Sequence, residues 1–403
     1  MNTSAQEKTY PYFESKAPGV YLEREFRKPH RTPFSTGVPA FLGSISSAPN
    51  SGNKDSRPIL QMISLWSHFE AHIGKLSPDS YLAYAVRGFF ENGGHWCYVV
   101  GLRDDTAGSL EAGLDAIAPL NTIDLVCAPD LAKTKDKARL FDLQQLVVNH
   151  CETMGDRFAI LDAGYDLVSS KYQSNDQVWE QWSEIDGKNG AIYYPWVKVR
   201  EFPPHKDLLP VPPCGHVAGV YARSDRSRGG VHKAPANEVL EGVVDLERQL
   251  TEADQADLNH KRINCMRSFP GRGIRVYGAR TLSGEQAWTY VNVRRLFLTV
   301  VRWIDWNMSD IPFEPNEPKL WARVERELHT FFADLYRSGA LQGRTPEESF
   351  YVKCNAETNP PELRELGQVV TEIGLAPTIP YEFVVVRLIH GARGVSINGP
   401  TRP

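Results

Sequence analysis

Residues 258–296 read LNHKRINCMRSFPGRGIRVYGARTLSGEQAWTYVNVRRL, and this order of elements decides how the rest of the chain is interpreted. The run Gly271-Arg272-Gly273 breaks the chain before residues 274–277, which predict a strand. Residues 278–282 predict a turn, and residues 291–295 predict a helix. Because the glycines precede a strand and a third glycine is missing, the order does not predict a dinucleotide-binding loop.

The N-terminal residues predict an arm. Residues 1–17 are polar and interrupted by prolines, so we expect a flexible segment there. Val20, Leu22 and Phe26 then recur on one face at a period of two, which predicts a strand. A strand so close to a loose terminus can pair with its own sheet or with the edge of a neighbour's sheet.

The middle of the chain predicts a parallel α/β sheet. Strands are expected at residues 96–100, 123–127 and 157–162, and a helix at residues 135–154 separates the last two. A strand–helix–strand unit of this length indicates a right-handed crossover and parallel strands.

The C-terminal third predicts a helix followed by a sheet. Residues 317–338 carry an apolar stripe at helical spacing, with Asn316 as the expected N-cap. Residues 350–355 predict a strand. Residues 381–389 are apolar on both faces, so they predict a strand in the interior of a sheet. After them, residues 391–403 predict a polar tail.

Composition excludes several classes of protein. The chain has 403 residues, of which 41% are hydrophobic, so it can bury a large core and form two or three domains. Its net charge of -4 provides no basic field for nucleic acid. The six cysteines are scattered without a C-x-x-C pair, which favours reduced, buried thiols. Since no signal peptide or membrane span is apparent, we expect a cytoplasmic protein.

A few polar residues could carry chemistry. His68 and His72 lie four residues apart, but the intervening glutamate is displaced by one position from the order of a zinc protease, which favours a structural pair. Asp124, Asp130 and Asp162 stand at the ends of predicted strands, where α/β enzymes place catalytic groups. No serine–histidine arrangement completes them, so we expect caps of loops or helices, with a cytosolic α/β enzyme as the alternative.

A small basic cluster surrounds Asp225. Arg223, Arg226 and Arg228 lack the interleaved aromatic residues of a nucleic-acid site, which favours a subunit interface or a solvated loop.

Several blocks of the sequence, taken in order, carry a resemblance to a known family. The blocks are residues 18–21, 37–43, 89–94, 97–100, 194–196, 212–215, 217–223, 234–237, 278–281, 313–316, 341–343 and 376–377. The chain resembles the contractile tail sheath proteins of bacteriophages and of phage-tail-like contractile injection systems. Tyr277 stands where tryptophan is common in that family. The short chain favours an injection system over a phage.

The resemblance implies an architecture of combined α/β and α+β class. An outer α/β domain is inserted between an N-terminal strand arm and a C-terminal mixed-sheet domain with packed helices. We expect the arm at residues 1–35, the outer domain at 36–265, the inner sheath domain at 266–390 and a C-terminal arm at 391–403.

The resemblance also implies a function and partners. Copies of the chain would stack as hexameric rings around an inner tube protein and contract to drive the tube through a target envelope. Baseplate and terminal cap proteins would be further partners, with no nucleic acid and no insertion into a membrane. Assembly would take place in the cytoplasm, as part of a phage tail or of a particle that is released or anchored to a membrane. The two arms and the α/β insertion argue against a tube subunit.

Particular residues follow from this interpretation, and none of them is catalytic, metal-binding or cofactor-binding. The inter-subunit strand arm would contain Val20, Tyr21, Leu22 and Phe26. The C-terminal sheet and arm would contain Phe383, Val384, Val385, Val386, Val395 and Ile397. The family motif is Gly278, Ala279, Arg280 and Thr281. On charged helix faces, the tube would meet Arg294, Arg295, Arg323 and Arg326.

Overall fold

A computed structural model describes most of the chain. The described residues are 35–45, 58–73, 80–164, 176–202, 207–227, 230–378, 384–391 and 394–401. The predicted strand that contains Val20, Tyr21, Leu22 and Phe26 lies outside them, and so does Phe383. Among the described residues, no helix combines the length and the apolar character needed to cross a membrane.

The larger sheet has nine strands. Their order is β2 (Ile59–Ile63), β3 (Cys97–Leu102), β1 (Pro39–Ser44), β4 (Leu125–Cys127), β5 (Phe158–Asp162), β6 (Gly190–Tyr194), β11 (Ile263–Phe269), β12 (Gly273–Tyr277) and β9 (Glu238–Val239). The six strands from β3 to β11 are parallel, and β2, β12 and β9 join antiparallel. The predicted parallel α/β sheet is therefore confirmed.

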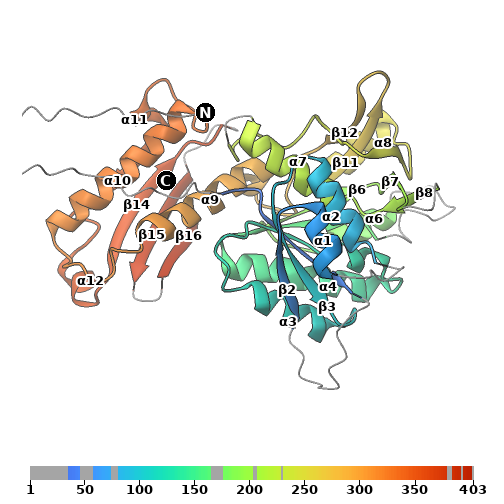
Figure 1. The fold of residues 1–403 in the computed structure, drawn as a ribbon. Coiled ribbons are helices and arrows are strands. Elements are labelled where there is room, and N and C mark those ends of the chain that lie inside the picture. Colours follow the sequence, from blue (N-terminus) through green and yellow to red (C-terminus); the bar gives the residue numbers. More distant parts are fainter. Residues whose placement is uncertain are drawn as a thin grey trace, which may run out of the picture. The chain divides into compact units, whose positions relative to one another are not determined.

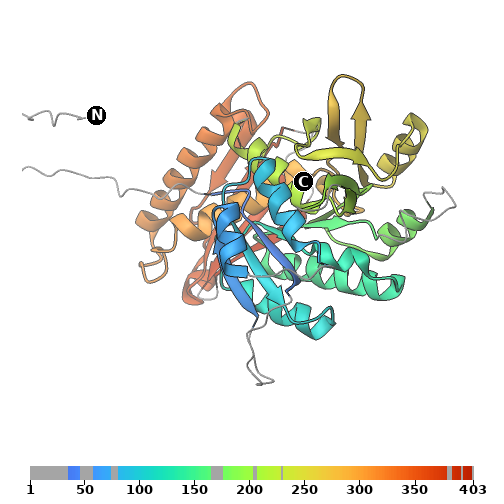
Figure 2. The ribbon, with the colours of Figure 1, turned by 45° about the vertical axis from the view of Figure 1, so that its right-hand side comes forward.

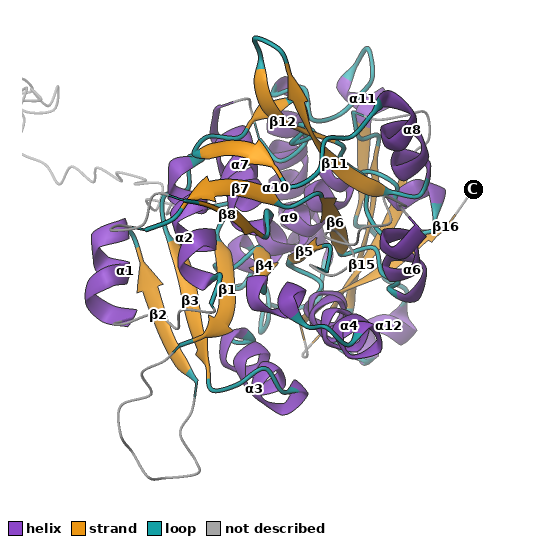
Figure 3. Ribbon diagram, turned by 90° about the vertical axis from the view of Figure 1, so that its right-hand side faces the viewer, coloured by secondary structure: helices purple, strands orange, loops and turns teal. Residues whose placement is uncertain are grey.

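Helices cover both faces of this sheet (Figure 1, Figure 3). One core contains residues of α2 (Leu82–Glu91) and α7 (Cys214–Ser227), and the other contains residues of α3 (Ala107–Ile117) and α4 (Lys137–Met154). In β1, Phe41 lies in the first core, whereas its neighbours along the strand lie in the second. Strands buried on both faces lack polar alternation, which is why they appear in the sequence as short apolar runs.

The predicted domain boundary at residue 265 is wrong. It falls inside β11, which pairs with β6 and, through a hairpin, with β12. The G-R-G break marks the tip of that hairpin, so the α/β unit continues to Tyr277 at least. Sequence periodicity locates such a strand but not the sheet that it joins.

The C-terminal part consists of helices and a four-stranded antiparallel sheet. The long helices are α9 (Val291–Asn307) and α10 (Pro318–Arg337), and the strands are β13 (Phe350–Lys353), β14 (Val369–Leu375), β15 (Val384–Gly391) and β16 (Gly394–Thr401). β15 pairs on both sides, as its apolar sequence predicted. Within the predicted C-terminal arm, residues 394–401 form β16, which pairs antiparallel with β15 of the same chain.

Val384, Val385 and Val386 lie on β15, and Val395 and Ile397 lie on β16, as the predicted C-terminal sheet requires. The remaining elements are α1 (Trp66–Ile73), α6 (Asp176–Glu184), α8 (Glu252–His260), α11 (Pro346–Ser349), α12 (Pro361–Glu365), and a small sheet of β10 (Val243–Leu246), β7 (Val197–Arg200) and β8 (Leu208–Val211).

The apolar stripe of α10 is buried as predicted. Its inward-facing residues are Leu320, Trp321, Val324, Leu328 and Phe332. The expected N-cap is wrong, since Glu317 precedes the helix and makes no side-chain cap. Asn316 instead donates to the carbonyl of Gln368 at 2.9 Å and accepts from the Trp321 indole at 2.8 Å.

Helices α2 and α7 pack unusually closely, and this contact buries a histidine. A Cβ atom on Gly215 would lie 2.1 Å from the carbonyl oxygen of Ala85, so only glycine allows this approach. A Cβ atom on Gly88 would lie 2.5 Å from the ring of His216. His216 is 1% exposed, and burial, aided by the charge of Arg87, lowers the pKa of its ring to about 4. The imidazole is therefore neutral in the folded chain near pH 7.

Replacing His216 with glutamine should change how stability depends on pH. Its pKa is about 4 in the folded chain and 6.5 in the reference state, so the unfolded chain takes up the proton first as the pH falls. The stabilisation is complete above about pH 6.5 and is lost toward about pH 4. From pH 7 to pH 5, the wild type should lose about 2 kcal/mol of unfolding free energy relative to His216→Gln in urea titrations.

His68→Gln, which removes an exposed ring, is the control for loss of any histidine. Equal pH dependence of the wild type and His216→Gln would contradict the neutral, buried ring.

Candidate functional site

Helix α9 belongs to two hydrophobic cores at once. Val291 and Leu298 pack in the core that contains α2 and α7. Another face carries Phe297, Val300 and Ile304 into the core of the C-terminal part. A helix that is apolar on several sides must be covered on all of them, so α9 forms the packed connection between the α/β unit and the C-terminal sheet.

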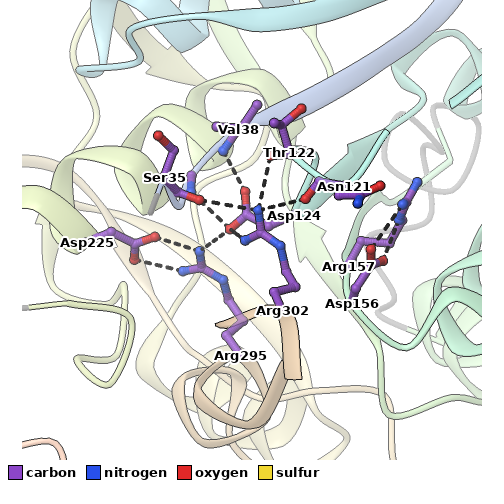
Figure 4. Close-up of polar contacts among 11 residues, drawn as sticks. Ser35, Val38, Asn121, Thr122, Asp124, Asp156, Arg157, Asp225, Arg295 and Arg302 are labelled. Atoms are coloured by element: carbon purple, nitrogen blue, oxygen red, sulfur yellow. Dashed lines mark hydrogen bonds and ion pairs between the residues drawn. The ribbon is translucent and has the colours of Figure 1, made fainter. Parts of the chain in front are cut away.

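Arginine side chains on this helix reach into the α/β unit (Figure 4). Both terminal nitrogens of Arg295 donate to the two carboxylate oxygens of Asp225 on α7, at 2.9 and 2.6 Å. One of them also donates to Asp124, which precedes β4, at 3.1 Å. The guanidinium lies over the ring of Tyr221, 4.8 Å from its centroid. The paired side chains of Arg295 and Asp225 are 3% and 2% exposed, so solvent screening is weak.

The second carboxylate also holds the chain before β1. Asp124 accepts hydrogen bonds from the backbone N–H groups of Gly37 and Val38 at 2.9 and 2.6 Å. Gly37 has a φ of 72°, and a Cβ atom there would lie 2.5 Å from the Cα atom of Ala222. Glycine is required at this position because of both the conformation and the close approach. One carboxylate thus connects β1, β4 and α9.

Two more buried arginines surround this centre. Arg302 on α9 lies 3.9 Å from Asp124 and donates to the carbonyls of Ser35, Asn121 and Thr122 at 3.2 to 3.3 Å (Figure 4). Arg157, whose side chain is 0% exposed, donates to the carbonyl of Ile117 at the end of α3 at 3.0 Å and pairs with Asp156. Each guanidinium therefore binds main-chain carbonyl groups of the α/β unit in addition to a carboxylate.

Arg294 faces a different part of the α/β unit. Its Nε atom donates to the side chain of Asn189 at 2.6 Å, and its guanidinium lies 4.7 Å from the centroid of the Trp288 ring. Asn292 donates to the carbonyl of His232 at 2.8 Å. We refer to Asp124, Asp225, Arg294, Arg295 and Arg302 as the α9 junction.

Burial and neighbouring carboxylates act in opposite directions on the pKa values of Arg295 and Arg294. Burial alone lowers the pKa of Arg295, but the carboxylates of Asp225 and Asp124 outweigh it and raise that pKa above its usual range. Burial lowers the pKa of Arg294 to about 10, and the carboxylates of Glu152 and Glu285 offset this shift only in part. Both arginines remain cationic at neutral pH.

The family motif leads into this helix. The Asn264 side chain on β11 accepts from the backbone N–H of Arg280 at 2.7 Å and donates to its carbonyl at 2.8 Å. Thr281 donates through its hydroxyl to the carbonyl of Trp288 at 2.5 Å, and the backbone N–H of Val291 donates to Ala279. A Cβ atom on Gly278 would lie 2.9 Å from the Cα atom of Asn264. The motif therefore fixes the chain between β12 and the first turn of α9.

The four arginines predicted to face the tube differ in how far they are exposed. Arg294 and Arg295 are 7% and 2% exposed, so their charges are used inside the subunit and do not form a charged surface. Arg323 is bound by the carboxylates of Asp310 and Glu327, and Arg326 is exposed.

The basic cluster around Asp225, predicted as a subunit interface or a solvated loop, does not form a solvated loop, because Asp225 lies on α7 and is 7% exposed; the interface alternative stays a prediction. The pair Arg294-Arg295 within an apolar helix was the available signal, because buried arginines require partners.

The residues of the enzyme alternative do not form one site. Asp130 follows β4 and accepts from the backbone N–H groups of Ser44 and Tyr81 at 2.7 and 2.6 Å. Asp162 ends β5 and accepts from the N–H of Cys214 at the start of α7 at 2.8 Å, while burial raises its pKa to about 7. Asp124 lies at the opposite end of its strand.

The predicted capping role of these aspartates is confirmed. Asp130 and Asp162 hold loops at the carboxyl ends of the strands, where α/β enzymes bind ligands, whereas Asp124 holds the chain before β1 at the other end. Within the part of the chain that the structure describes, no three His, Cys, Asp or Glu residues form a group that could hold a metal ion.

Comparisons with known proteins agree with this geometry. Residues 105–282 match the family described as phage tail sheath protein central domain, and this match ends just after β12, the last strand of the nine-stranded sheet along the chain. The tail sheath protein of Salmonella phage ViI is 27% identical over 178 residues. The alignment covers 43% of this chain and only 27% of the phage protein.

Solved structures match over almost the whole chain. The helical sheath of the anti-feeding prophage in its contracted state is 30% identical, with a TM-score of 0.71, over 92% of this chain and 98% of that one. This chain belongs to the contractile tail sheath protein family. The contracted sheath complex of the extracellular contractile injection system PVC is also 30% identical, with a TM-score of 0.69, over 92% and 96% of the two chains. The resemblance inferred from the ordered sequence blocks is confirmed.

Exchanging Arg295 for methionine should strongly destabilise this sheath protein. The variant leaves Asp225 and Asp124 buried without their main cation, which should cost about 3–5 kcal/mol of unfolding free energy. Urea unfolding of the unassembled chain measures the loss, and Arg326→Met, on an exposed position, should stay within about 0.5 kcal/mol of the wild type. Replacing both charges in Arg295→Met/Asp225→Leu should recover part of the loss. If Arg295→Met had the same free energy of unfolding as the wild type, the α9 junction would not stabilise the fold.

Proposed function

We propose that this chain is the structural subunit of a contractile sheath, whose copies stack as hexameric rings around an inner tube. Contraction of the sheath drives the tube through a target envelope. The observation that carries the proposal is the match to a contracted helical sheath over 92% of this chain and 98% of that one. The role is structural, since the aspartates that an α/β enzyme would use bind backbone groups instead.

The α9 junction suits a subunit that must transmit force. Main-chain and side-chain hydrogen bonds connect α9 to the strands and helices of the α/β unit, and its other face lies in the C-terminal core. In this proposal the extended sheath is a kinetically trapped assembly, and contraction leads to a packing of lower free energy. A difference of about a few kcal/mol per subunit, summed over many coupled copies, provides the driving force.

Strand addition between copies keeps the subunits connected in this proposal. Among the strands that the structure describes, β13 and β16 are the outer ones of the C-terminal sheet, so we propose that their outer edges receive further strands. The N-terminal strand around Val20 and Phe26 is the proposed addition from a neighbouring subunit, together with exchange of the C-terminal arm. Main-chain hydrogen bonds of this kind can persist while the bodies of the subunits rotate.

The inner tube, a baseplate and a terminal cap are the proposed partners, and assembly takes place in the cytoplasm. Of the four arginines expected to face the tube, Arg326 is the remaining candidate, because its side chain is exposed and lies on α10. A single exposed ion pair contributes little, about 0–1 kcal/mol, so such a contact would act with many copies.

Deletion of residues 1–25 should prevent a stable contractile lattice. The chain would be expressed with the small tube protein encoded beside it and inspected by negative-stain electron microscopy. Wild-type protein should give hollow, cross-striated cylinders in extended and contracted lengths, whereas the deletion should give short or absent cylinders.

A shorter deletion of residues 1–8, which leaves the strand around Val20 intact, is the matched control. Normal, contraction-competent cylinders from the longer deletion would contradict strand exchange. Uniform small particles from the wild type under all salt conditions would contradict the sheath function itself.

A further inference from the structure

The loop between α9 and α10 displays an aromatic ring from a strained backbone. Phe313 is 105% exposed and has a φ of 83°. It follows Pro312, and the N–H of Glu314 donates to the carbonyl of Ile311 at 3.0 Å, which closes a tight turn. The residue after proline in such a turn needs a positive φ, and glycine is the usual choice because a side chain is disfavoured there.

The chain itself contains the ordinary version of this turn. At the tip of the β11–β12 hairpin, Gly271 follows Pro270 with a φ of 69°, and the N–H of Arg272 donates to the carbonyl of Phe269 at 2.9 Å. The same geometry is thus occupied by glycine in one place and by phenylalanine in the other. In the isolated subunit, Phe313 strains the backbone and exposes an apolar ring to water. No contact of the ring with the described residues offsets these two unfavourable effects.

Side-chain contacts connect the loop around Phe313 to α10 and to the chain before β14. Arg323 on α10 binds Asp310 on one side of the turn and lies 3.9 Å from Glu314 on the other. Asn316 connects the end of the loop to Gln368, as described above. A ring that is displayed by a fixed loop needs little ordering when a partner binds.

The loop surface combines this ring with negative charge. The side chains of Asp310 and Glu314 are 58% and 50% exposed, and Glu317 is exposed as well. A complementary surface would offer guanidinium groups beside aromatic rings, since such groups bind carboxylates and stack on phenylalanine.

The β11–β12 hairpin of the same chain offers this complement. Arg267 lies over the rings of Phe269 and Tyr277, with distances of 5.2 and 6.0 Å to their centroids. Arg272 at the tip lies over Phe269 at 5.6 Å. Arg275 is paired across the hairpin with Arg267, so it stands on the same face. β6 pairs with β11 only up to Cys265, and Figure 3 shows the tip extending past the neighbouring strands.

We propose that the Phe313 loop of one subunit docks on the β11–β12 hairpin of a second copy of this chain. The two surfaces differ, so the contact is head-to-tail, and repetition of such a contact produces an open helical array or a ring. The assignment rests on the proposed sheath function and adds to it a particular pair of surfaces.

The first experiment separates the ring from the backbone strain. Phe313→Gly removes both, whereas Phe313→Ala removes only the ring. Both variants should raise the protein concentration at which polymer sediments by about tenfold or more. In the unassembled chain, Phe313→Gly should melt at or above the wild-type temperature. Leu65→Ala, at an exposed leucine of the α/β unit, should assemble as the wild type does. Wild-type assembly of both Phe313 variants, or equal impairment by Leu65→Ala, overturns the proposal.

The second experiment identifies the partner surface by charge reversal. Glu314→Arg and Arg272→Glu should each impair assembly, because every contact then brings together two like charges. An equimolar mixture of the two should recover assembly in part, because each contact between unlike copies pairs opposite charges. The double variant should restore assembly at least in part, since it exchanges the charges across the same contact.

A double variant that assembles worse than either single variant overturns the pairing. A defect that appears only when the tube is present, with normal polymers in its absence, assigns the loop to the tube and also overturns it. Polymers of the wild type in the same assays support the sheath function, so its failure and the failure of this contact are distinguishable.

Discussion

The ion pair between Arg295 and the carboxylates of Asp225 and Asp124 is the constraint on which the rest of the structure depends. A guanidinium that is 3% exposed requires partners of fixed geometry, because an unpaired buried charge is strongly unfavourable. Asp225 comes from α7, and Asp124 comes from the chain before β4 and also binds the backbone before β1. The position of α9 is therefore tied to the centre of the parallel sheet, and through α9 the C-terminal core is tied as well.

Hydrophobic burial alone would not position this helix so specifically. Apolar side chains such as Leu298 and Phe297 attach α9 to two cores, but they tolerate small shifts along the helix axis. Polar contacts do not tolerate such shifts. These contacts are the bidentate pair of Arg295 with Asp225 and the hydrogen bonds of Arg302 to the carbonyls of Asn121 and Thr122. In the contractile sheath that we propose, such a connection would favour motion of the subunit as a whole over displacement of α9 within it.

The sequence predicted those parts of the fold that depend on local pattern. The parallel strands at β4 and β5, the stripe of α10 and the interior position of β15 follow from periodicity and apolar runs. Two features were not predicted: the sheet to which β11 and β12 belong, and the pairing of β16 with β15. Both depend on which strands pair with one another, and hydrophobic periodicity does not encode this pairing.

Site residues were harder to predict. A charged residue on a helix has the same sequence appearance whether it is solvated or buried. Arg295 was therefore expected at the surface, and the cluster around Asp225 in a subunit interface or a solvated loop. Along the chain, Arg295 lies 171 residues from Asp124 and 70 residues from Asp225. Only the tertiary structure therefore shows that these residues are partners. Phe313 likewise appeared only as part of a family block, and its strained turn became evident from the backbone.

The most direct test of this account is a high-resolution helical reconstruction of the assembled protein in both its extended and its contracted state. The account predicts that the Arg295 guanidinium stays within hydrogen-bonding distance of Asp225 and Asp124 in both, while contacts between subunits change. A reconstruction in which α9 separates from α7 and β4 in one of the two states would contradict it.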